Sequence, residues 1–431
     1  MTQNATDIIY DAIIVGAGYS GLAAARHLND AGKKILVLEA RDRVGGRAKT
    51  INTEDGKQWD VGASFLGKGQ DRMFDLAKEF SIETYPALGG STAKTIFANP
   101  QGESKAYSGL VPPLGLWAIL NSARLVNKFE NLIKTVNIEE PWKTPNAAHL
   151  DRITVHEWFK DNCWSEVLHA MMQMSIEVTL GLHPSEVSLL HAMFFYRSIE
   201  SWTTAMSVEN GTQSHLMVGG GQAIANKLHS ALGPEVVHLG EPVTSISYTS
   251  SPSSVTITTP LATYKAKKTI VAIPPAPILK IQFSPSLPTP KQFLLQQTTM
   301  GQMAKIILTY RTPFWVSSNL RGEATSVSTH ISYVICTDRL ESTSTGTGPH
   351  KLLAFIAGSK FTSFLSQTHH PDSDSTDSKI RQLAIKEIVK IFGEQAAEPQ
   401  DVFFHTMLFD DDGGSDYGGG GCPVASPKPG I

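Results

Sequence analysis

Hydrophobic residues near the start of the chain fall into short runs that end at a glycine or an acidic residue. Residues 10–16 are almost continuously apolar and end at glycine, a pattern that predicts a buried strand of a parallel sheet. The alanine-rich residues 20–31 predict a helix, and residues 34–39 predict a second buried strand. A strand, a helix and a strand in this order predict one right-handed crossover unit with parallel strands.

The pattern beyond this unit predicts a larger and mixed architecture. Residues 71–80 have helical periodicity with an aspartate at the start, and residues 110–210 read as mostly helical. Strand and helix patterns then alternate again. Strands are predicted within 236–248, 254–259, 267–275 and 304–310, and a helix within 380–392.

Several segments carry no such periodicity. Stretches rich in serine and threonine at 249–254, 341–347 and 372–378 predict surface loops, and the tail 410–431 shows no clear structure. The short apolar stretch Leu110–Leu120 contains two prolines. It is shorter than the roughly 18 residues that a membrane span needs, so we interpret it as a buried loop entering a helix rather than a membrane contact.

Composition narrows the classes of protein. The chain has 431 residues, 41% hydrophobic and 18% charged, which is typical of a globular protein with two interleaved domains. It has 37 basic and 40 acidic residues, so the net charge is 37 − 40 = −3. This balance gives no reason to expect a nucleic acid partner, and it leaves a small cationic substrate open.

The spacing of the cysteines and the lack of an apolar leader limit which metal sites and which cellular compartment we expect. The three cysteines Cys163, Cys336 and Cys422 are widely spaced, which argues against a disulfide framework or a zinc site. His369 and His370 lie in a polar stretch, where a solvated loop is the simpler interpretation, so no metal is predicted. We find neither a signal core nor a membrane anchor, and expect an intracellular, cytoplasmic protein, with peroxisomal or other targeting left open.

A glycine-rich turn joins the first predicted strand to its helix. The run Gly16, Ala17, Gly18, Tyr19, Ser20 and Gly21 has the form GxGxxG in the strand-to-helix context that a dinucleotide site requires. Gly16 permits the tight turn, Gly18 lets backbone N–H groups approach a pyrophosphate, and Gly21 lets helix and strand pack closely. The positive end of the helix then favours the phosphate charge.

An acidic residue ends the second predicted strand. A carboxylate at Glu39, about 20 residues after the glycine turn, is placed to accept hydrogen bonds from the ribose hydroxyls of a bound nucleotide. It disfavours the 2′-phosphate of NADP. The alternative is a glycine-rich turn that binds nothing.

A second glycine turn follows at once. After Ala40 and Arg41 come Gly45, Gly46 and Arg47, and Arg47 is expected to make charge-assisted bonds to a pyrophosphate. A nicotinamide cofactor does not need this second turn, whereas a longer cofactor with ribitol contacts does. The alternative is a solvated basic loop.

At these motifs the sequence resembles the flavin-containing amine oxidase family, which includes the monoamine and polyamine oxidases. The resemblance begins at residues 11–50 and continues in 59–72, in the glycine run 218–222 and in 241–243. It implies FAD as cofactor, with Gly62, Ala63 and Ser64 beside the flavin and the Val243 backbone at the adenine. The fold that it implies is α/β, an FAD-binding Rossmann-like (two-dinucleotide-binding) domain with an interleaved α+β substrate domain.

A lysine in an apolar strand is the catalytic candidate. Lys305 lies in residues 302–310, where burial of an ammonium is costly unless it has a partner and a purpose. The family carries a lysine on a matching strand, bonded through water to the flavin N5, and the resemblance gives Lys305 that role. The alternative is a lysine whose head reaches solvent from the end of a strand.

The C-terminal part departs from the family pattern. Cys422 follows two glycines as in the family, where the matching cysteine binds the flavin covalently in some members, but we expect an ordinary thiol. Pro423 stands where the family has an aromatic residue, and the chain stops at Ile431 before the family's final segment. Either the substrate cage is built differently or the chain binds FAD poorly.

These observations give one expected organisation. Residues 1–85, 212–290 and 401–431 would form the FAD-binding domain, and residues 86–211 and 291–400 the substrate domain. The expected reaction is oxidation of the C–N bond of a small amine to an imine, with O2 reduced to H2O2. The alternatives are a related flavoprotein that oxidises another C–N or C–C bond, and a truncated, non-catalytic relative.

Overall fold

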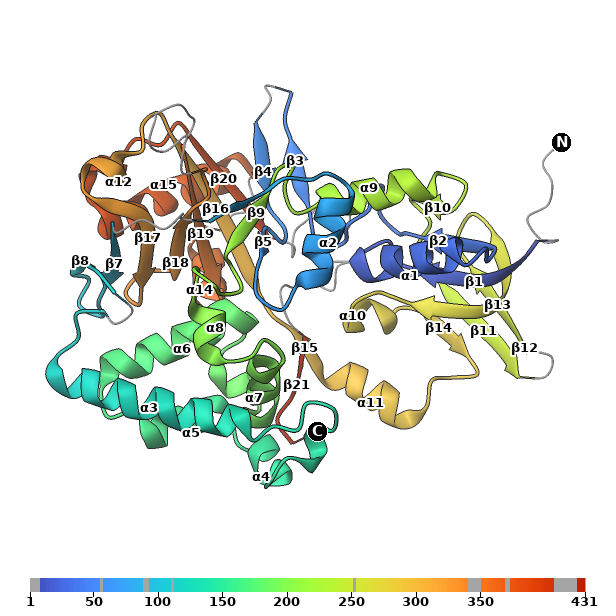
Figure 1. The fold of residues 1–431 in the computed structure, drawn as a ribbon, viewed down its shortest axis with the longest axis horizontal. Helices are drawn as coiled ribbons and strands as arrows, with labels where there is room; N and C mark the ends of the chain where they lie inside the picture. The colour runs from blue at the N-terminus through green and yellow to red at the C-terminus, as the bar shows by residue number, and fades with distance from the viewer. Residues whose placement is uncertain are drawn as a thin grey trace.

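The computed structural model describes most of the chain in one folded body (Figure 1). The described residues are 8–54, 57–87, 93–109, 112–250, 253–339, 350–368, 373–406 and 425–430. Within them, two seven-stranded sheets and a group of helices account for most of the regular structure. The expected mixed α/β fold is therefore confirmed.

The first sheet carries the N-terminal unit. Its strand order is β10-β2-β1-β13-β12-β11-β14, and β1 pairs in parallel with both β2 and β13. The interior residues of β1 and β2 are buried on both faces, as the continuous apolar runs predicted. The strands are β1 (Ile9–Val15), β2 (Ile35–Leu38), β10 (Val237–His238), β11 (Ser245–Ser250), β12 (Ser253–Thr258), β13 (Thr263–Val271) and β14 (Gln282–Ser284).

Two helices from distant parts of the chain pack on one another beside this sheet. Helix α1 (Tyr19–Asp30) contributes Leu22 and Ala25 to a shared apolar cluster, and α9 (Ala223–Leu232) contributes Ile224 and Leu228. The cluster fixes the start of α1 against the sheet, and with it the glycine turn that precedes the helix.

The second sheet lies at the upper left of Figure 1, away from the N-terminal unit. Its order is β20-β16-β19-β18-β17-β7-β8, and helix α15 (Ser373–Phe392) packs against it. The strands are β7 (Lys94–Ala98), β8 (Ser104–Tyr107), β16 (Met303–Tyr310), β17 (Leu320–Ser326), β18 (Tyr333–Cys336), β19 (His350–Ala357) and β20 (Asp401–Thr406).

A helical unit lies below the second sheet in Figure 1 and forms a separate apolar core. Leu125, Phe129 and Ile133 recur every four residues on α3 and face this core. The helices are α3 (Leu116–Lys134), α4 (Ala147–Arg152), α5 (Val155–Asn162), α6 (Glu166–Leu180), α7 (Leu189–Ser198) and α8 (Trp202–Met206).

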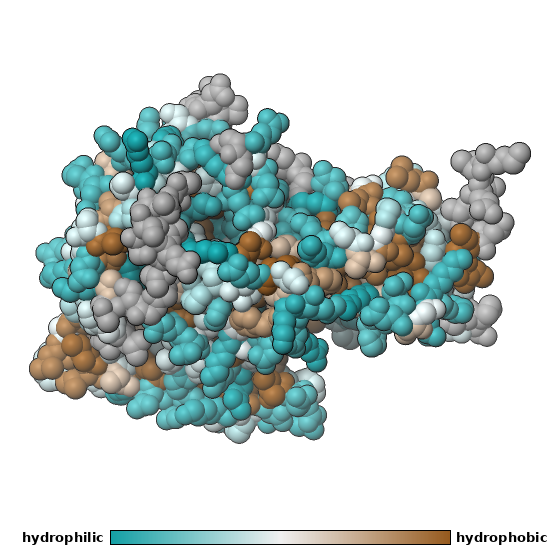
Figure 2. All heavy atoms as spheres, turned by 45° about the horizontal axis from the view of Figure 1, so that its top comes forward, coloured by the Kyte–Doolittle hydropathy of each residue, from teal (hydrophilic) through white to brown (hydrophobic). Residues whose placement is uncertain are grey.

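The first turn of α3 extends beyond that core. Leu116 is 70% exposed and Trp117 82% exposed, and hydrophobic atoms gather at the matching lower left edge of Figure 2. The predicted entry into a helix is therefore right, but the prediction that this stretch is buried is wrong for these residues. No helix among the described residues is long and apolar enough to cross a membrane.

Smaller elements join these parts. Strands β3 and β4 form a hairpin, β5, β9 and β6 form a three-stranded sheet, and β15 pairs with β21. These strands are β3 (Thr50–Asn52), β4 (Gln58–Asp60), β5 (Phe65–Leu66), β6 (Thr84–Pro86), β9 (His215–Met217), β15 (Thr298–Met300) and β21 (Ala425–Pro427). The remaining helices are α2 (Asp71–Glu79), α10 (Pro275–Ile278), α11 (Thr289–Gln297), α12 (Phe314–Ser317) and α14 (Ser359–Thr368).

Three predictions of irregular structure need correction. β11 and β12 pair as far as Ser250 and Ser253, so the predicted loop 249–254 is mostly the tip of a hairpin. α15 begins at Ser373, inside the predicted loop 372–378, and β21 gives the tail a short strand. The predicted loop 341–347 lies outside the described residues, as do His369 and His370.

The division into two domains stays a proposal, with one change. β20 lies beside β16 in the second sheet, with Lys305 opposite His405. Residues 401–406 therefore belong with the residues that we assigned to the substrate domain, rather than with the first sheet.

Candidate cofactor site

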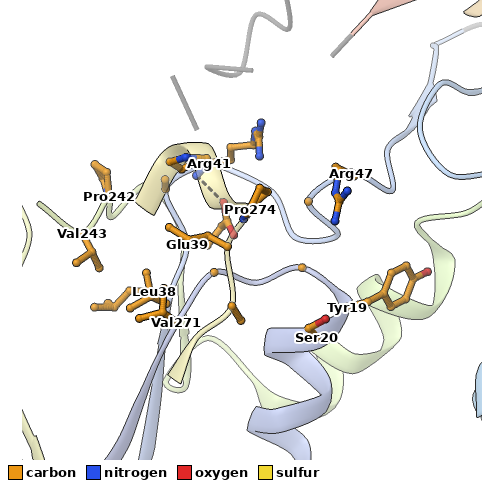
Figure 3. Close-up of a pocket in the computed structure, with 18 of the residues that line it drawn as sticks. Tyr19, Ser20, Leu38, Glu39, Arg41, Arg47, Pro242, Val243, Val271 and Pro274 are labelled. Carbon is orange, nitrogen blue, oxygen red and sulfur yellow. Dashed lines mark hydrogen bonds between the residues drawn. The ribbon is translucent and has the colours of Figure 1, made fainter. Parts of the chain in front are cut away.

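A pocket of about 740 Å³ lies where the carboxyl ends of β1, β2 and β13 meet (Figure 3). Parallel strands that share an edge leave such a crevice beyond their carboxyl ends, and this is where sheets of this class bind ligands. The volume falls within the range of small-molecule and cofactor sites.

The glycine turn after β1 forms one wall. Gly16 has a φ of +100°, which favours glycine, and a Cβ on Gly21 would lie 1.9 Å from the Gly16 carbonyl oxygen. Gly18 has an ordinary φ of −71°, and a Cβ there would meet no atom within 4 Å. Gly16 and Gly21 thus shape the turn, whereas Gly18 leaves open space in the pocket beside the helix N-terminus.

Glu39 lies buried at the end of β2, with its carboxylate held by the backbone. The N–H of Ala17 donates to Oε2 at 2.6 Å, and the N–H of Arg41 donates to Oε1 at 3.0 Å. Each carboxylate oxygen can accept a further hydrogen bond, so both remain able to accept from ligand hydroxyls. Two backbone N–H groups thus fix the Glu39 carboxylate at the edge of the pocket.

The second glycine turn closes against the first. Gly18 and Gly45 form an isolated parallel bridge, and Arg43 donates to the Gly46 carbonyl at 2.9 Å. Gln222 bridges this turn to β3, because it donates to the Val44 carbonyl and accepts from the Thr50 N–H, both at 2.9 Å.

The pocket has an apolar end and a polar end. Leu38, Val243 and Val271 gather on one side of Figure 3, and Tyr19, Ser20 and Arg47 lie on the other. An apolar slot suits a planar base, and a basic side chain near the helix N-terminus suits a diphosphate. With Glu39 between the two ends, the residues present fit FAD.

Lys305 lies behind the pocket wall rather than in it. Its Nζ donates to the Asp60 carbonyl at 3.1 Å, to the Gly62 carbonyl and to Ser64 Oγ at 2.5 Å. These three acceptors match the three protons of an ammonium. Ala63, between the last two acceptors, lines the pocket, so Lys305 holds the segment that forms part of the wall.

The predicted cofactor residues fall into two groups. Twelve of them line the pocket: Gly16, Gly18, Tyr19, Ser20, Glu39, Ala40, Arg41, Gly45, Gly46, Arg47, Ala63 and Val243. Gly21 supports the turn from beneath, and Gly62 and Ser64 bind Lys305 instead. Val243 lines the pocket from an irregular segment between β10 and β11, so its predicted strand context is wrong.

One wall of the pocket escaped sequence reasoning. Residues 270–275 and Pro277, Lys280 and Ile281 line it from the end of β13 onward. The signal was the paired proline that ends the predicted strand at 267–275. The proline pair indicates a pocket wall only if β13 lies directly beside β1, and the local sequence does not predict that pairing.

The cysteines and the metal prediction add little to this site. Neither Cys163 nor Cys336 lines the pocket, and burial raises the pKa of the Cys163 thiol to about 11. Cys422 lies outside the described residues, so its proposed relation to the cofactor stays untested. Within the described parts of the chain, no cluster of three or more His, Cys, Asp or Glu side chains could hold a metal ion.

Sequence comparison places the chain among known flavoproteins. The family described as flavin containing amine oxidoreductase matches residues 19–412. A Mycobacterium tuberculosis protein named as a flavin-containing monoamine oxidase, AofH, is 31% identical over 97% of this chain and 86% of its own length. Flavin-containing amine oxidase B of Canis lupus familiaris is 33% identical over 72% of this chain. The match spans only 59% of the dog enzyme.

Solved structures agree with the fold. Cyclohexylamine oxidase from Brevibacterium oxydans superposes with a TM-score of 0.87 and 27% identity, over 98% of this chain and 89% of its own. Wild-type putrescine oxidase bound to putrescine gives the same TM-score and coverage at 23% identity, which speaks for the fold alone.

Proposed function

The chain belongs to the family of flavin containing amine oxidoreductases, and from this we propose that it oxidises the C–N bond of a small amine with O2 as the electron acceptor. The observation that carries the proposal is the pocket at the ends of β1, β2 and β13, with its two glycine turns and its buried carboxylate. Bound FAD would supply two-electron oxidation of the amine to an imine and would pass the electrons to O2, giving H2O2.

The protein's own groups would bind and orient the cofactor. The N–H groups at the start of α1, with Arg47, would bind the diphosphate, and Glu39 would accept from the ribose hydroxyls. Leu38 and Val243 would enclose the base. Leu38 is the last residue of β2, and the other groups lie at the start of α1 or in loops that follow strands of the first sheet. The fold fixes these segments, so the site is formed before the cofactor binds.

Lys305 would hold a proton at Nζ, which is bonded to Gly62 and Ser64, the two neighbours of the pocket-lining Ala63. A fixed positive charge near a flavin favours negative charge that develops during reduction of O2. We therefore assign Lys305 to the oxygen step rather than to amine oxidation.

The test starts from the visible spectrum of the purified chain, reconstituted with FAD where needed. We expect one FAD per chain and bleaching of its colour by an amine in the absence of O2. Re-admitted O2 should restore the colour and yield H2O2. The amine panel should include putrescine and cyclohexylamine, because the structurally similar enzymes are named for them.

Two results would contradict the proposal. A chain that stays colourless after incubation with FAD would indicate a non-catalytic relative. A yellow chain that no amine bleaches, but that another reduced substrate does, would indicate oxidation of a different bond.

A further inference from the structure

The loop between β10 and β11 supplies part of the apolar end of the pocket. Pro242 and Val243 line the pocket there and lie together at one side of Figure 3. Glu241 precedes them, and its N–H donates to the Glu39 carbonyl at 2.8 Å. Thr244 follows them, and its N–H donates to the carbonyl of the last residue of β12 at 2.9 Å. Because Pro242 has no N–H to donate, the neighbours of this pair hold the backbone of the wall.

The side chain of Glu241 holds the same loop a second time. The residue is 8% exposed and is not among those that line the pocket. The Tyr264 hydroxyl donates to its carboxylate, at 3.0 Å from one oxygen and 2.8 Å from the other. Thr259 Oγ1 lies 3.1 Å from Oε2, and His238 Nδ1 lies 3.1 Å from Oε1. The carboxylate therefore joins the loop to β10, to β13 and to the turn between β12 and β13.

The groups around this carboxylate account for its burial. Burial raises the pKa of Tyr264, and the hydrogen bond to Glu241 raises it further, so the hydroxyl stays protonated and remains a donor. Tyr10 also faces Glu241, and its pKa is raised by burial and then by the Glu241 charge. His238 Nδ1 lies 3.5 Å from the Tyr264 hydroxyl, which closes a triangle of three polar side chains. A buried carboxylate is stable where such partners surround it.

The two acidic residues at this edge have different tasks. The Glu39 carboxylate lies at the pocket and remains able to accept from a ligand. The Glu241 carboxylate acts only through the two wall residues that follow it in the chain. Without it, the wall would keep its backbone bonds but lose the side-chain contacts that fix its distance from the sheet.

We propose that Glu241 is a positioning residue for the base end of the cofactor site. Its contacts with Tyr264, Thr259 and His238 hold Pro242 and Val243 where they enclose the adenine of FAD. This inference rests on the FAD pocket of the function proposed above. It does not depend on the oxidation of an amine.

The test is calorimetric titration of the cofactor-free chain with FAD and with ADP, which carries only the adenosine half of the cofactor. Glu241→Ala should weaken the binding of both by the same factor of about ten, as the loss of an orienting outer contact does at other sites. Glu241→Gln keeps the shape and an acceptor for Tyr264, so its affinities should recover to within about threefold of the wild type.

Two further variants separate positioning from stability. Tyr264→Phe keeps the ring but removes the donor, so it tests the same contact where Glu241→Ala does not fold, and it should weaken both ligands by about threefold. Glu387→Ala is the matched control. It removes a carboxylate that is 3% exposed beside His330, in helix α15 on the second sheet. It should lower the Tm and leave both affinities unchanged.

The outcomes distinguish this inference from the proposed function. Wild-type affinities for FAD and ADP in folded Glu241→Ala or Tyr264→Phe would overturn the inference. So would a loss for FAD without a loss for ADP, or an equal loss in Glu387→Ala. A chain that no amine reduces, but whose Glu241 and Tyr264 variants bind ADP more weakly than the wild type, would contradict the proposed function and support the inference.

Discussion

Lys305 shows how a single side chain can hold a charge inside an apolar strand. The strand β16 is buried along nearly its whole length, and Lys305 is 8% exposed. Three oxygens accept from its Nζ, and the Phe355 ring centroid lies 5.6 Å away. An ammonium with its protons bonded to oxygens and an aromatic face nearby is buried at a lower cost.

Replacement of this lysine should separate the two half-reactions. In Lys305→Met, reoxidation of the reduced flavin by O2 should slow by on the order of a hundredfold, because one fixed positive charge is lost from the site. Anaerobic reduction by the amine should change much less. Stopped-flow absorbance measures both steps, and equal slowing of the two would contradict the assigned role. Lys57→Met, which removes a lysine paired with Asp401, should leave both rates unchanged.

At the scale of elements, α15 docks on the second sheet through a buried carboxylate. Glu387 accepts from the N–H of His330 at 2.5 Å and from the N–H of Ile331 at 3.2 Å, and its Oε1 lies 3.1 Å from His330 Nδ1. Burial alone would raise the pKa of Glu387, but these hydrogen bonds and the neighbouring His330 outweigh it and leave the pKa lowered.

The lowered pKa of Glu387 gives a pH-dependent contribution to stability. A carboxylate with a depressed folded pKa stabilises the fold above its unfolded value of 4.5, and the contribution is lost as pH falls through the folded value. Glu387→Gln should therefore reduce the free energy of unfolding by roughly 2 kcal/mol at pH 7 and by clearly less near pH 4. Urea unfolding at both pH values measures this. The exposed Glu394→Gln is the control, and an equal loss at both pH values would contradict the account.

Sequence predicted those elements whose signal is local. β1, α1 and β2 were found within one residue at each end, because a buried apolar run and a glycine turn suffice to mark them. About the first two turns of α15 were missed, because the serine-rich start of this helix looks like a loop and forms a helix only as part of the element that packs on the sheet.

At the scale of the whole molecule, the site is assembled from segments far apart in the chain. The turns near Gly18 and Gly45, the segment 60–64, the loop 219–222 and residues 270–281 meet at one edge of the first sheet. The glycine motifs in the sequence predicted the first two of these segments, the turns near Gly18 and Gly45. The contribution of residues 270–281 follows from the pairing of β13 with β1, and that of Asp60 from contacts with β16 and the glycine loop. Such long-range contacts leave no mark in local sequence.

The central claim is that this pocket holds FAD, and Gly18→Trp tests it most directly. Gly18 has an ordinary φ and open space around a Cβ, so an indole there should fill the pocket without disturbing the backbone. Gly115 precedes α3 with a similarly extended backbone and open surroundings, so Gly115→Trp is the matched control. In a fluorescence titration of the cofactor-free chains with FAD, the wild type and Gly115→Trp should bind one FAD per chain, and Gly18→Trp should bind none. Equal binding by all three would contradict the account.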